Sequence, residues 1–320
     1  MAYAAEAKIA EELGRILMDG SLYRGAKPVM WSPVEKTALA EAEIEYEDHT
    51  STTIYARFPV THAAHASLEG ASIIIWTTTP WTMPANRAVA YGDDISYQVT
   101  EVLAANDGAL CAKGDVVVIA DDLAESVMRA IGASETKIRA HLTGREMAGS
   151  IAAHPMAGHG YDFDVPLLAG SHVTTEQGTG FVHIAPGHGV EDYELAHLKH
   201  GIAVPDTVGE DGVILPHLPV FGGMHVLRDN AKIAEIMAEH NGVIGIGKLV
   251  HSYPHSWRSK APLIYRNTAQ WFVSMESHGL RDTALGELAK TKFYPAAGQK
   301  RLTSMIAQRP DWCLSRQRAW

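Results

Sequence analysis

The chain has 320 residues, of which 46% are apolar and 20% are charged, an ordinary balance for a soluble globular protein. The net charge is −10, but residues 251–320 carry eleven Lys/Arg against four Asp/Glu, so a basic end (+7) follows an acidic body (−17). This split suits a protein that binds a polyanion with one surface, or it is a charge imbalance without a partner. No apolar run approaches the roughly 18 residues of a membrane span, and two cysteines, Cys111 and Cys313, exclude a disulfide framework and favour a reducing cytoplasm.

The first region, residues 1–46, begins with the pattern of an amphipathic helix. It lacks the basic start and apolar core of a signal peptide. The glycine at position 20 is expected to end the helix. Its apolar stripe consists of Ile9, Leu13, Ile16 and Leu17.

The middle region, residues 47–247, mixes short β-branched runs, turn residues and amphipathic stretches. Because these runs are irregularly spaced and have no βαβ rhythm, we expect an α+β fold with a β-barrel-like mixed sheet surrounded by helices. A doubly wound fold is disfavoured for the same reason. The expected strands are Ile73–Trp76, Ile95–Val102 and Asp115–Ala120, and the expected helices are Leu123–Ile131, Tyr193–His200 and Ala231–His240.

A glycine-rich segment, GVIGIGK (Gly242–Lys248), nearly matches a phosphate-binding loop. However, Leu249 stands where that motif needs Ser or Thr to hold magnesium. A helix is expected before the segment and a strand after it, which reverses the order that the motif requires. We therefore expect a glycine turn that ends the helix. The last region, residues 248–320, is basic and aromatic.

The first segment with a chemical signal is WTTTPWTMPANRA, which begins at Trp76. As composition alone it predicts the end of a β-strand, since Thr favours strands and Pro is common where they stop. As a site, its hydroxyls on a proline-stiffened turn offer donors and acceptors to a ribose, a phosphate and a water. The threonines are Thr77, Thr78, Thr79 and Thr82.

The second segment is GTGFVHIAPGHGVEDYELAHLKHG, residues 178–201. Its glycines permit close backbone approach, and Glu191 and Asp192 fall at the start of a predicted helix. Acidic residues there are favoured by the helix dipole alone, but such a carboxylate can also bind an ammonium ion. His183, His188 and Asp192 are also close enough in sequence to suggest a metal site.

Together the two segments resemble the editing insertion, or connective polypeptide, of class I isoleucyl-tRNA synthetases, and the resemblance covers essentially the whole chain. ALAEAEIEYED, HSYPHSWRSKAP, TAQWFVSM and RPDWCLSRQRAW are similar to flanking family segments. Valyl and leucyl relatives share the general editing fold but differ in the threonine segment. The resemblance implies an N-terminal connective segment over residues 1–46, the editing domain over 47–247, and a C-terminal connective segment over 248–320 that leads back to a catalytic domain.

The resemblance also implies roles for single residues. Thr77, Thr78 and Thr79 match the threonine-rich stretch that cradles the terminal adenosine of tRNA and helps position water. Asp192 matches the carboxylate that holds the α-ammonium group of the substrate. These four residues are the expected catalytic group.

Three further residues are expected to bind the substrate. His183 matches the residue whose bulk helps to keep isoleucine out of the editing pocket. Asn86 and Trp76 belong to the threonine segment itself. The implied partner is the 3′ end of tRNA(Ile) carrying a wrong amino acid, and a monomer is expected.

The sequence departs from the family at a zinc knuckle that many relatives build from two C-x-x-C pairs. The matching positions are Ser32, Glu35, Ser256 and Ser259, so thiolate ligands are absent and no structural zinc is expected. The His-Ile-Gly-His and Lys-Met-Ser-Lys-Ser signatures of amino-acid activation are missing too. ATP and magnesium are therefore expected to serve the parent enzyme only, and no cofactor is expected in this chain.

The implied function is hydrolysis of the ester bond of Val-tRNA(Ile). The residues supply no obvious general base, so a ribose hydroxyl of the substrate is expected to assist proton transfer. Two alternatives stay open: a non-catalytic tRNA-binding module, and a metal-dependent hydrolase built on His183, His188 and Asp192.

Overall fold

The computed structural model describes residues 2–317 and divides into two compact units. The smaller unit consists of Met1–Val29 and Thr268–Trp320, and the larger of Met30–Asn267. Arg318, counted above as part of the basic region, and the last two residues of the segment RPDWCLSRQRAW lie outside the described residues. The units divide the chain after residues 29 and 267, whereas the predicted family segments divide it after residues 46 and 247. Those family segments stay a prediction.

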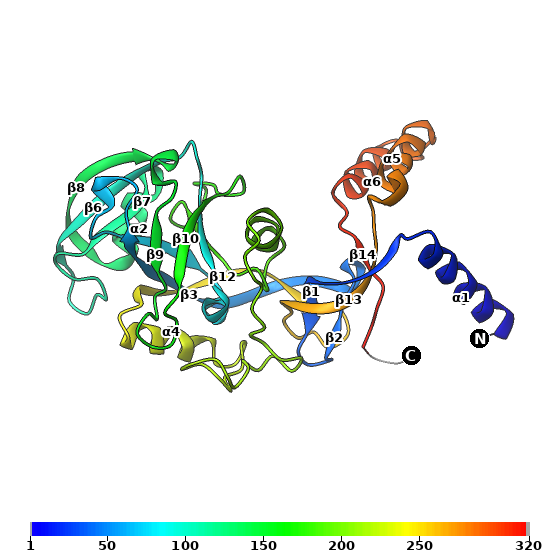
Figure 1. Cartoon of the computed structure of the whole chain (residues 1–320), viewed down its shortest axis with the longest axis horizontal. Helices are drawn as coiled ribbons and strands as arrows, with labels where there is room; N and C mark the ends of the chain where they lie inside the picture. The colour runs from blue at the N-terminus through cyan, green and yellow to red at the C-terminus, as the bar shows by residue number, and fades with distance from the viewer. Residues whose placement is uncertain (1, 318–320) are drawn as a thin grey trace. The chain divides into compact units, whose positions relative to one another are not determined.

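The smaller unit confirms the predicted N-terminal helix, α1 (Tyr3–Met18), which is followed by Gly20 at a φ of +83°. Helices α5 (Leu280–Lys290) and α6 (Ala297–Gln308) form a second helical element, a hairpin that Figure 1 shows in orange and red. None of these three helices contains a buried residue. The remaining elements are the start of β1 (Leu22–Ser32), the end of β13 (Ile264–Val273), the 3-10 turn Ser277–Gly279, α5 (Leu280–Lys290), α6 (Ala297–Gln308) and β14 (Trp312–Cys313).

The larger unit contains a ten-stranded mixed sheet, in the order β11-β5-β10-β9-β3-β4-β7-β6-β8 with β12 paired to β3. The β10–β5 and β4–β7 pairs are parallel, and the other pairs are antiparallel. Its strands are β3 (Ile44–His62), β4 (Ser72–Thr77), β5 (Ala88–Tyr91), β6 (Ser96–Ala105), β7 (Val116–Ala120), β8 (Ala133–Thr143), β9 (Ile151–Ala153), β10 (Asp164–Ala169), β11 (Phe181–Ile184) and β12 (Val243–Ser256).

The prediction of an α+β fold with a mixed sheet and surrounding helices is confirmed. The sheet runs openly from β11 to β8, however, so the described strands do not close into a barrel. Strands β3 and β12 form a long antiparallel ribbon (Figure 1). A short strand, β2 (Thr37–Ala38), pairs with the end of β1 outside this sheet.

Helices cover the sheet at three places. The predicted helices at 123–131 and 231–240 are confirmed as α2 (Ala124–Ile131) and α4 (Asn230–Glu239). The predicted helix at 193–200 starts earlier, as α3 (Val190–Asp192), and continues as a wide π turn over Tyr193–Lys199. Short 3-10 turns complete the unit at Glu41–Glu43, Ala66–Leu68, Pro80–Ala85, Asp121–Leu123 and Gly144–Met147.

Two apolar clusters form the core of the larger unit. In one, α2 packs on the sheet through Ile74, Val117, Ile119, Val127, Ile131 and Ile244. In the other, the π turn packs on β5 and β11 through Ala88, Ala90, Ile184, Leu195 and Ala196. The second cluster therefore fixes β11 and the helix after it, which together carry the second predicted motif.

The expected glycine turn at Gly242–Lys248 is only partly correct. Gly242 ends the loop after α4, but residues 243–248 already belong to strand β12. Gly247 pairs with Thr53 of β3 and leaves room for its hydroxyl, since a Cβ at Gly247 would lie 2.9 Å from Thr53 Oγ1. The segment thus forms part of a sheet and not a phosphate-binding loop. Within residues 2–317, no helix is both long and apolar enough to cross a membrane.

Candidate functional site

The threonine segment forms the end of β4 and a rigid turn after it. Thr77 is the last residue of β4, and Thr79 precedes the 3-10 helix Pro80–Ala85. Prolines at the first and fifth positions of this helix restrict its backbone, and all six of its residues are buried. The sequence therefore holds the threonines on a turn with little freedom to move. We call residues 77–86 the threonine turn.

Three hydroxyl groups of this turn are linked. Thr79 N–H donates to Thr77 Oγ1 at 3.1 Å, and the Thr77 and Thr79 hydroxyl oxygens are also 3.1 Å apart. Thr82 Oγ1 donates to the Thr79 carbonyl at 2.8 Å and lies 3.4 Å from Thr79 Oγ1. Residues three apart share one side of a 3-10 helix, which explains the second contact. Thr78 is half-buried and lies between two members of this chain in sequence.

His183 brings the second motif against the threonine turn. Strand β11 carries it and pairs it with Val89 of β5, and only 8% of its surface is exposed. Its Nε2 lies 3.0 Å from Thr82 Oγ1, and its Nδ1 lies 3.4 Å from Asn86 Nδ2. Asn86 Nδ2 also donates to the Ala88 carbonyl at 2.9 Å, which fixes the orientation of the amide.

These contacts determine where the proton of His183 lies. The Asn86 Nδ2 group can only donate, so Nδ1 of His183 accepts and its Nε2–H donates to Thr82. Burial lowers the pKa of His183 to about 3, and the neighbouring His154 and His188 rings add to the effect. The lowered pKa and these contacts make the ring a neutral hydrogen-bond donor at physiological pH. Asn86 Oδ1 is fully buried and has no hydrogen-bond partner among the described residues.

Asp192 lies within the second motif, at the end of α3. Its Oδ2 accepts the Ala185 N–H at 2.8 Å, which ties it to the residue two positions after His183. Gly189 makes room for it, because a Cβ at that position would lie 3.0 Å from Asp192 Cγ. Burial raises the pKa of Asp192 to about 7; the Ala185 bond opposes this and the charge of Glu191 adds to it. A cation beside this carboxylate would favour its ionised form.

Trp76 joins the two motifs by packing. It is half-buried in β4, where it pairs with Tyr55. Gly178, the first residue of the second motif, has a φ of +90°, and a Cβ there would lie 3.8 Å from Trp76 Cε3. The indole ring thus lies beside the start of the second motif.

The structure does not bring His183, His188 and Asp192 together as metal ligands. Both ring nitrogens of His188 are engaged, Nδ1 at 2.8 Å from the Tyr265 carbonyl and Nε2 at 2.8 Å from Thr207 Oγ1. Burial lowers its pKa to about 4. Across residues 2–317, no group of three or more His, Cys, Asp or Glu side chains is placed to hold a metal ion.

The four positions that match the family zinc knuckle do meet, through a carboxylate. Glu35 Oε1 accepts from Ser256 Oγ at 2.6 Å and from Ser259 N–H at 3.2 Å. The Glu35 N–H donates to Ser32 Oγ at 3.1 Å. Burial acts to raise the pKa of Glu35, but the bonds from Ser256 and Ser259 and the charge of Arg258 outweigh it and lower that pKa. Hydrogen bonds thus join the turn at residues 32–35 to the turn at residues 256–259.

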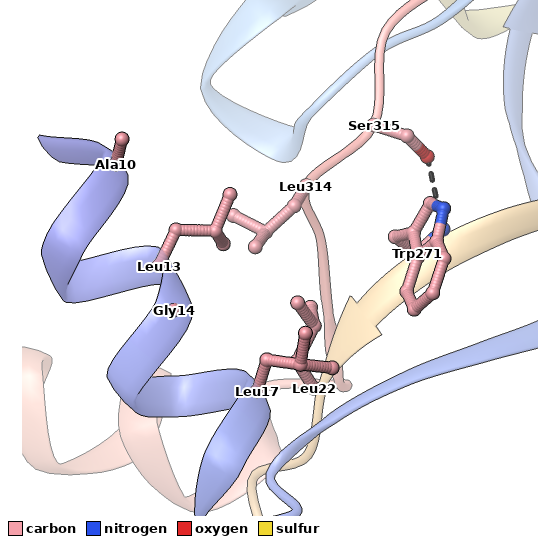
Figure 2. A pocket seen from close by; sticks show the side chains of 8 residues that line it. All are labelled: Ala10, Leu13, Gly14, Leu17, Leu22, Trp271, Leu314 and Ser315. Carbon is pink, nitrogen blue, oxygen red and sulfur yellow. Dashed lines mark hydrogen bonds between the residues drawn. The ribbon is translucent and has the colours of Figure 1, made fainter. Parts of the chain in front are cut away.

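An apolar groove of about 490 Å³ lies in the smaller unit, and none of the predicted site residues lines it. Figure 2 shows Leu13 and Leu17 of α1 pointing toward Leu314 and Leu22. Ser315 Oγ accepts from Trp271 N–H at 3.0 Å beside them. The groove has apolar walls and lacks a charged group, so it offers no chemistry for ester hydrolysis.

Sequence reasoning missed two residues that hold the threonine turn. The sequence signal for Thr82 is its spacing of three residues from Thr79 within a proline-bounded turn. His154, whose Nε2 lies 2.9 Å from the Met83 carbonyl, is 71 residues away in sequence, and no local pattern indicates that contact.

A family model and the similar sequences indicate the same protein family. The model of class I tRNA synthetases (I, L, M and V) matches residues 1–320. The isoleucine–tRNA ligase of Pelagibacter ubique is 50% identical over 320 residues, and that of Gluconobacter oxydans is 48% identical over 335 residues. Each match covers 100% of this chain and 35% of the ligase, so the chain spans about a third of the length of these relatives.

Two solved structures have a partly similar fold. GlLeuRS-CP1 matches 61% of this chain and 98% of its own, with 11% identity and a TM-score of 0.47. The editing domain of the P. knowlesi cytosolic leucyl-tRNA synthetase matches 60% of this chain and 95% of its own, with 10% identity and a TM-score of 0.44.

Proposed function

The chain belongs to the class I tRNA synthetases (I, L, M and V), and on that premise we propose that it is the editing region of an isoleucine–tRNA ligase, which hydrolyses Val-tRNA(Ile). The single observation that carries the proposal is the contact between the two motifs, in which His183 bonds Thr82 and faces Asn86. The parent enzyme would attach isoleucine to tRNA(Ile) with ATP and magnesium, and this chain needs neither for hydrolysis. A cytoplasmic monomer that binds the 3′ end of a mischarged tRNA(Ile) is part of the same proposal.

A second site is needed because one methylene separates valine from isoleucine. An apolar pocket gains only about 1–3 kcal/mol from that group, a general figure for which isoleucyl-tRNA synthetases themselves are the usual illustration. A site that admits valine and excludes isoleucine by overlap solves the problem. His183 suits this role because its ring is held by bonds at both nitrogens and cannot easily move aside.

The remaining residues orient the ester. Asp192 holds the α-ammonium group, and the hydroxyls of Thr77, Thr78 and Thr79 hold the terminal adenosine and a water. Asn86, whose Oδ1 has no hydrogen-bond partner among the described residues, and Trp76 belong to the same proposed site. Because the pKa of His183 is about 3, that ring does not remove a proton from water at neutral pH. The protein therefore supplies orientation and exclusion, and a ribose hydroxyl of the substrate assists the proton transfer.

One assay separates this proposal from its two alternatives. The chain is mixed with Val-tRNA(Ile), and both hydrolysis and tRNA binding are measured with and without a strong chelator. Hydrolysis that is insensitive to the chelator supports editing. Loss of hydrolysis on chelation would instead favour a metal-dependent hydrolase, and binding without hydrolysis would favour a tRNA-binding module.

A further inference from the structure

His154 lies outside the predicted site but contacts the backbone of the threonine turn. It is 1% exposed, its Nε2 lies 2.9 Å from the Met83 carbonyl, and Met156 N–H donates to its Nδ1 at 3.1 Å. A backbone amide can only donate, so Nδ1 must accept and the ring proton must lie on Nε2. His154 therefore donates to Met83 as a neutral ring.

Aromatic packing fixes the ring in this orientation. Tyr161 stacks on His154 with ring centroids 4.8 Å apart and an interplanar angle of 20°, and Phe163 and Phe58 lie at 5.4 and 6.2 Å. Tyr161 is itself held, because its hydroxyl donates to the Pro219 carbonyl at 2.8 Å. Rotation of the His154 ring would break this packing and both hydrogen bonds together.

The Met83 carbonyl is the point where His154 acts on the site. Met83 is fully buried, and its oxygen also accepts the Asn86 N–H at 3.0 Å, the bond that ends the 3-10 helix. Asn86 is the residue whose amide faces His183 Nδ1. The Met83 carbonyl oxygen is thus shared by His154 and by the backbone N–H of Asn86. Asn86 is the residue whose side-chain amide sets the proton position of His183.

Two neutral histidines therefore hold adjacent residues of the turn from different elements. His183 donates to the Thr82 hydroxyl from β11, and His154 donates to the Met83 carbonyl from the loop after β9. Loss of either bond would free one side of the turn that carries both Thr82 and Asn86.

We propose that His154 is a positioning residue of the editing site, which fixes the Met83 carbonyl so that Asn86 and Thr82 keep His183 in its Nε2–H form. The effect on hydrolysis rests on the proposed function, whereas the effect on the His183 ring does not. His154 is suited to the role at neutral pH because burial, aided by the charge of Arg87 and opposed by the Met83 bond, lowers its pKa to about 4.

The first test uses the unaltered chain. With histidine labelled by ¹⁵N, both His154 and His183 should show one proton-bearing nitrogen, Nε2, and one bare nitrogen, Nδ1, at neutral pH. Either ring with its proton on Nδ1, or a mixture of both forms, would overturn the proposal. This measurement is independent of whether the chain hydrolyses any ester.

The second test compares His154→Phe, which keeps the ring packing and removes the donor, with Tyr161→Phe, which removes a hydrogen bond from the same cluster without touching the turn. His154→Phe should mix the two forms of His183 and lower Val-tRNA(Ile) hydrolysis on the order of tenfold. Tyr161→Phe should do neither, even if it lowers the unfolding temperature as much. Equal effects of the two variants on His183 and on hydrolysis would contradict the proposal.

A third variant, His154→Gln, covers the case in which His154→Phe does not fold. Its amide can donate to Met83 but cannot restore the aromatic packing. A hydrolysis rate of His154→Gln close to that of the unaltered chain, despite a lowered unfolding temperature, would support positioning. A rate that simply follows the loss of stability would overturn it. If the unaltered chain hydrolyses nothing, the proposed function fails while the ¹⁵N signals of His183 still decide the role of His154.

Discussion

His183 and Asp192 lie nine residues apart in one motif, and burial disfavours the charged form of both, so it shifts their pKa values in opposite directions. His183 makes hydrogen bonds to Thr82 and Asn86 as a neutral ring, and its pKa of about 3 keeps it neutral. Asp192 has the Ala185 amide as its hydrogen-bond partner, and its pKa of about 7 leaves it between two charge states at physiological pH. In the proposed function, His183 acts by its shape and Asp192 by its charge.

This difference suggests a division of labour within the proposed site. A wall that selects by size must not change with pH, and burial achieves that for His183. A buried carboxylate is costly to ionise by itself, so a cation that binds beside it strongly stabilises its ionised form. The experiments below test whether the two residues differ in this way.

The largest effect is expected for Asp192→Ala. Removing a charged hydrogen-bond partner costs about 1.5–3 kcal/mol, so kcat/KM for Val-tRNA(Ile) should fall about 10- to 100-fold. Glu191→Gln is the matched control, because Glu191 is exposed and adjacent, and should retain most activity. Deacylation that is unchanged in Asp192→Ala would remove Asp192 from the mechanism.

A smaller effect is expected from pH alone. With a pKa of about 7 for Asp192, its ionised fraction rises about fivefold between pH 6 and pH 7, where the α-ammonium group stays mostly charged. KM should therefore fall about fivefold over this range while kcat changes little. A pH dependence carried by kcat instead would indicate that Asp192 acts as a general base and not as an anchor.

Stability should also depend on pH through these groups. His154, His183 and His188 have pKa values of about 3–4, below the ordinary 6.5, so the folded state takes up fewer protons than the unfolded one and loses stability as pH falls below 6.5. Asp192, raised from 3.8 to about 7, opposes this because it is protonated only in the folded state near pH 5. Together these four groups should take up about two protons on unfolding near pH 5. In Asp192→Asn the three histidines alone should take up about three.

Urea unfolding at pH 5 and pH 6 measures this proton uptake. The slope of unfolding free energy with pH should be steeper in Asp192→Asn than in the unaltered chain. Equal slopes would show that Asp192 has an ordinary pKa when the site is empty.

Much of the larger unit was predictable from sequence. Runs such as Ile73–Trp76 are apolar and β-branched, and they became strand β4 because a buried strand favours those residues. The helix at 124–131 followed from its periodicity, and in the structure it ends at Gly132, which adopts the left-handed conformation. The open path of the sheet was not predictable, since strand order depends on long-range pairing that no local pattern encodes.

The site was predictable in its segments and not in its contacts. Threonine and proline in succession indicated a rigid polar turn, and the resemblance named His183 and Asp192. The bond from His183 to Thr82 joins residues 101 positions apart, and the His154 bond to Met83 joins residues 71 apart. The pKa of Asp192 also depends on burial by the folded chain, which a sequence motif does not show.

The smallest effect is expected at Glu35, away from the threonine turn. Glu35→Gln keeps the shape of the cluster with Ser256 but weakens two bonds to a charged acceptor, so unfolding free energy at neutral pH should fall by about 1 kcal/mol. Because the pKa of Glu35 is lowered, its contribution is present above pH 4.5 and is lost as pH falls through the folded value. Glu69→Gln, at an exposed position, is the control and should change stability little. Equal stability of the two variants would contradict a structural role for Glu35.

The most direct test of the central claim is the ratio of Val-tRNA(Ile) to Ile-tRNA(Ile) deacylation rates, measured for the chain and for His183→Ala. If His183 excludes isoleucine by its bulk, the unaltered chain should prefer Val-tRNA(Ile) by about tenfold or more, and His183→Ala should bring the ratio close to one by gaining hydrolysis of Ile-tRNA(Ile). An unchanged ratio in His183→Ala, with Ile-tRNA(Ile) still rejected, would contradict the account.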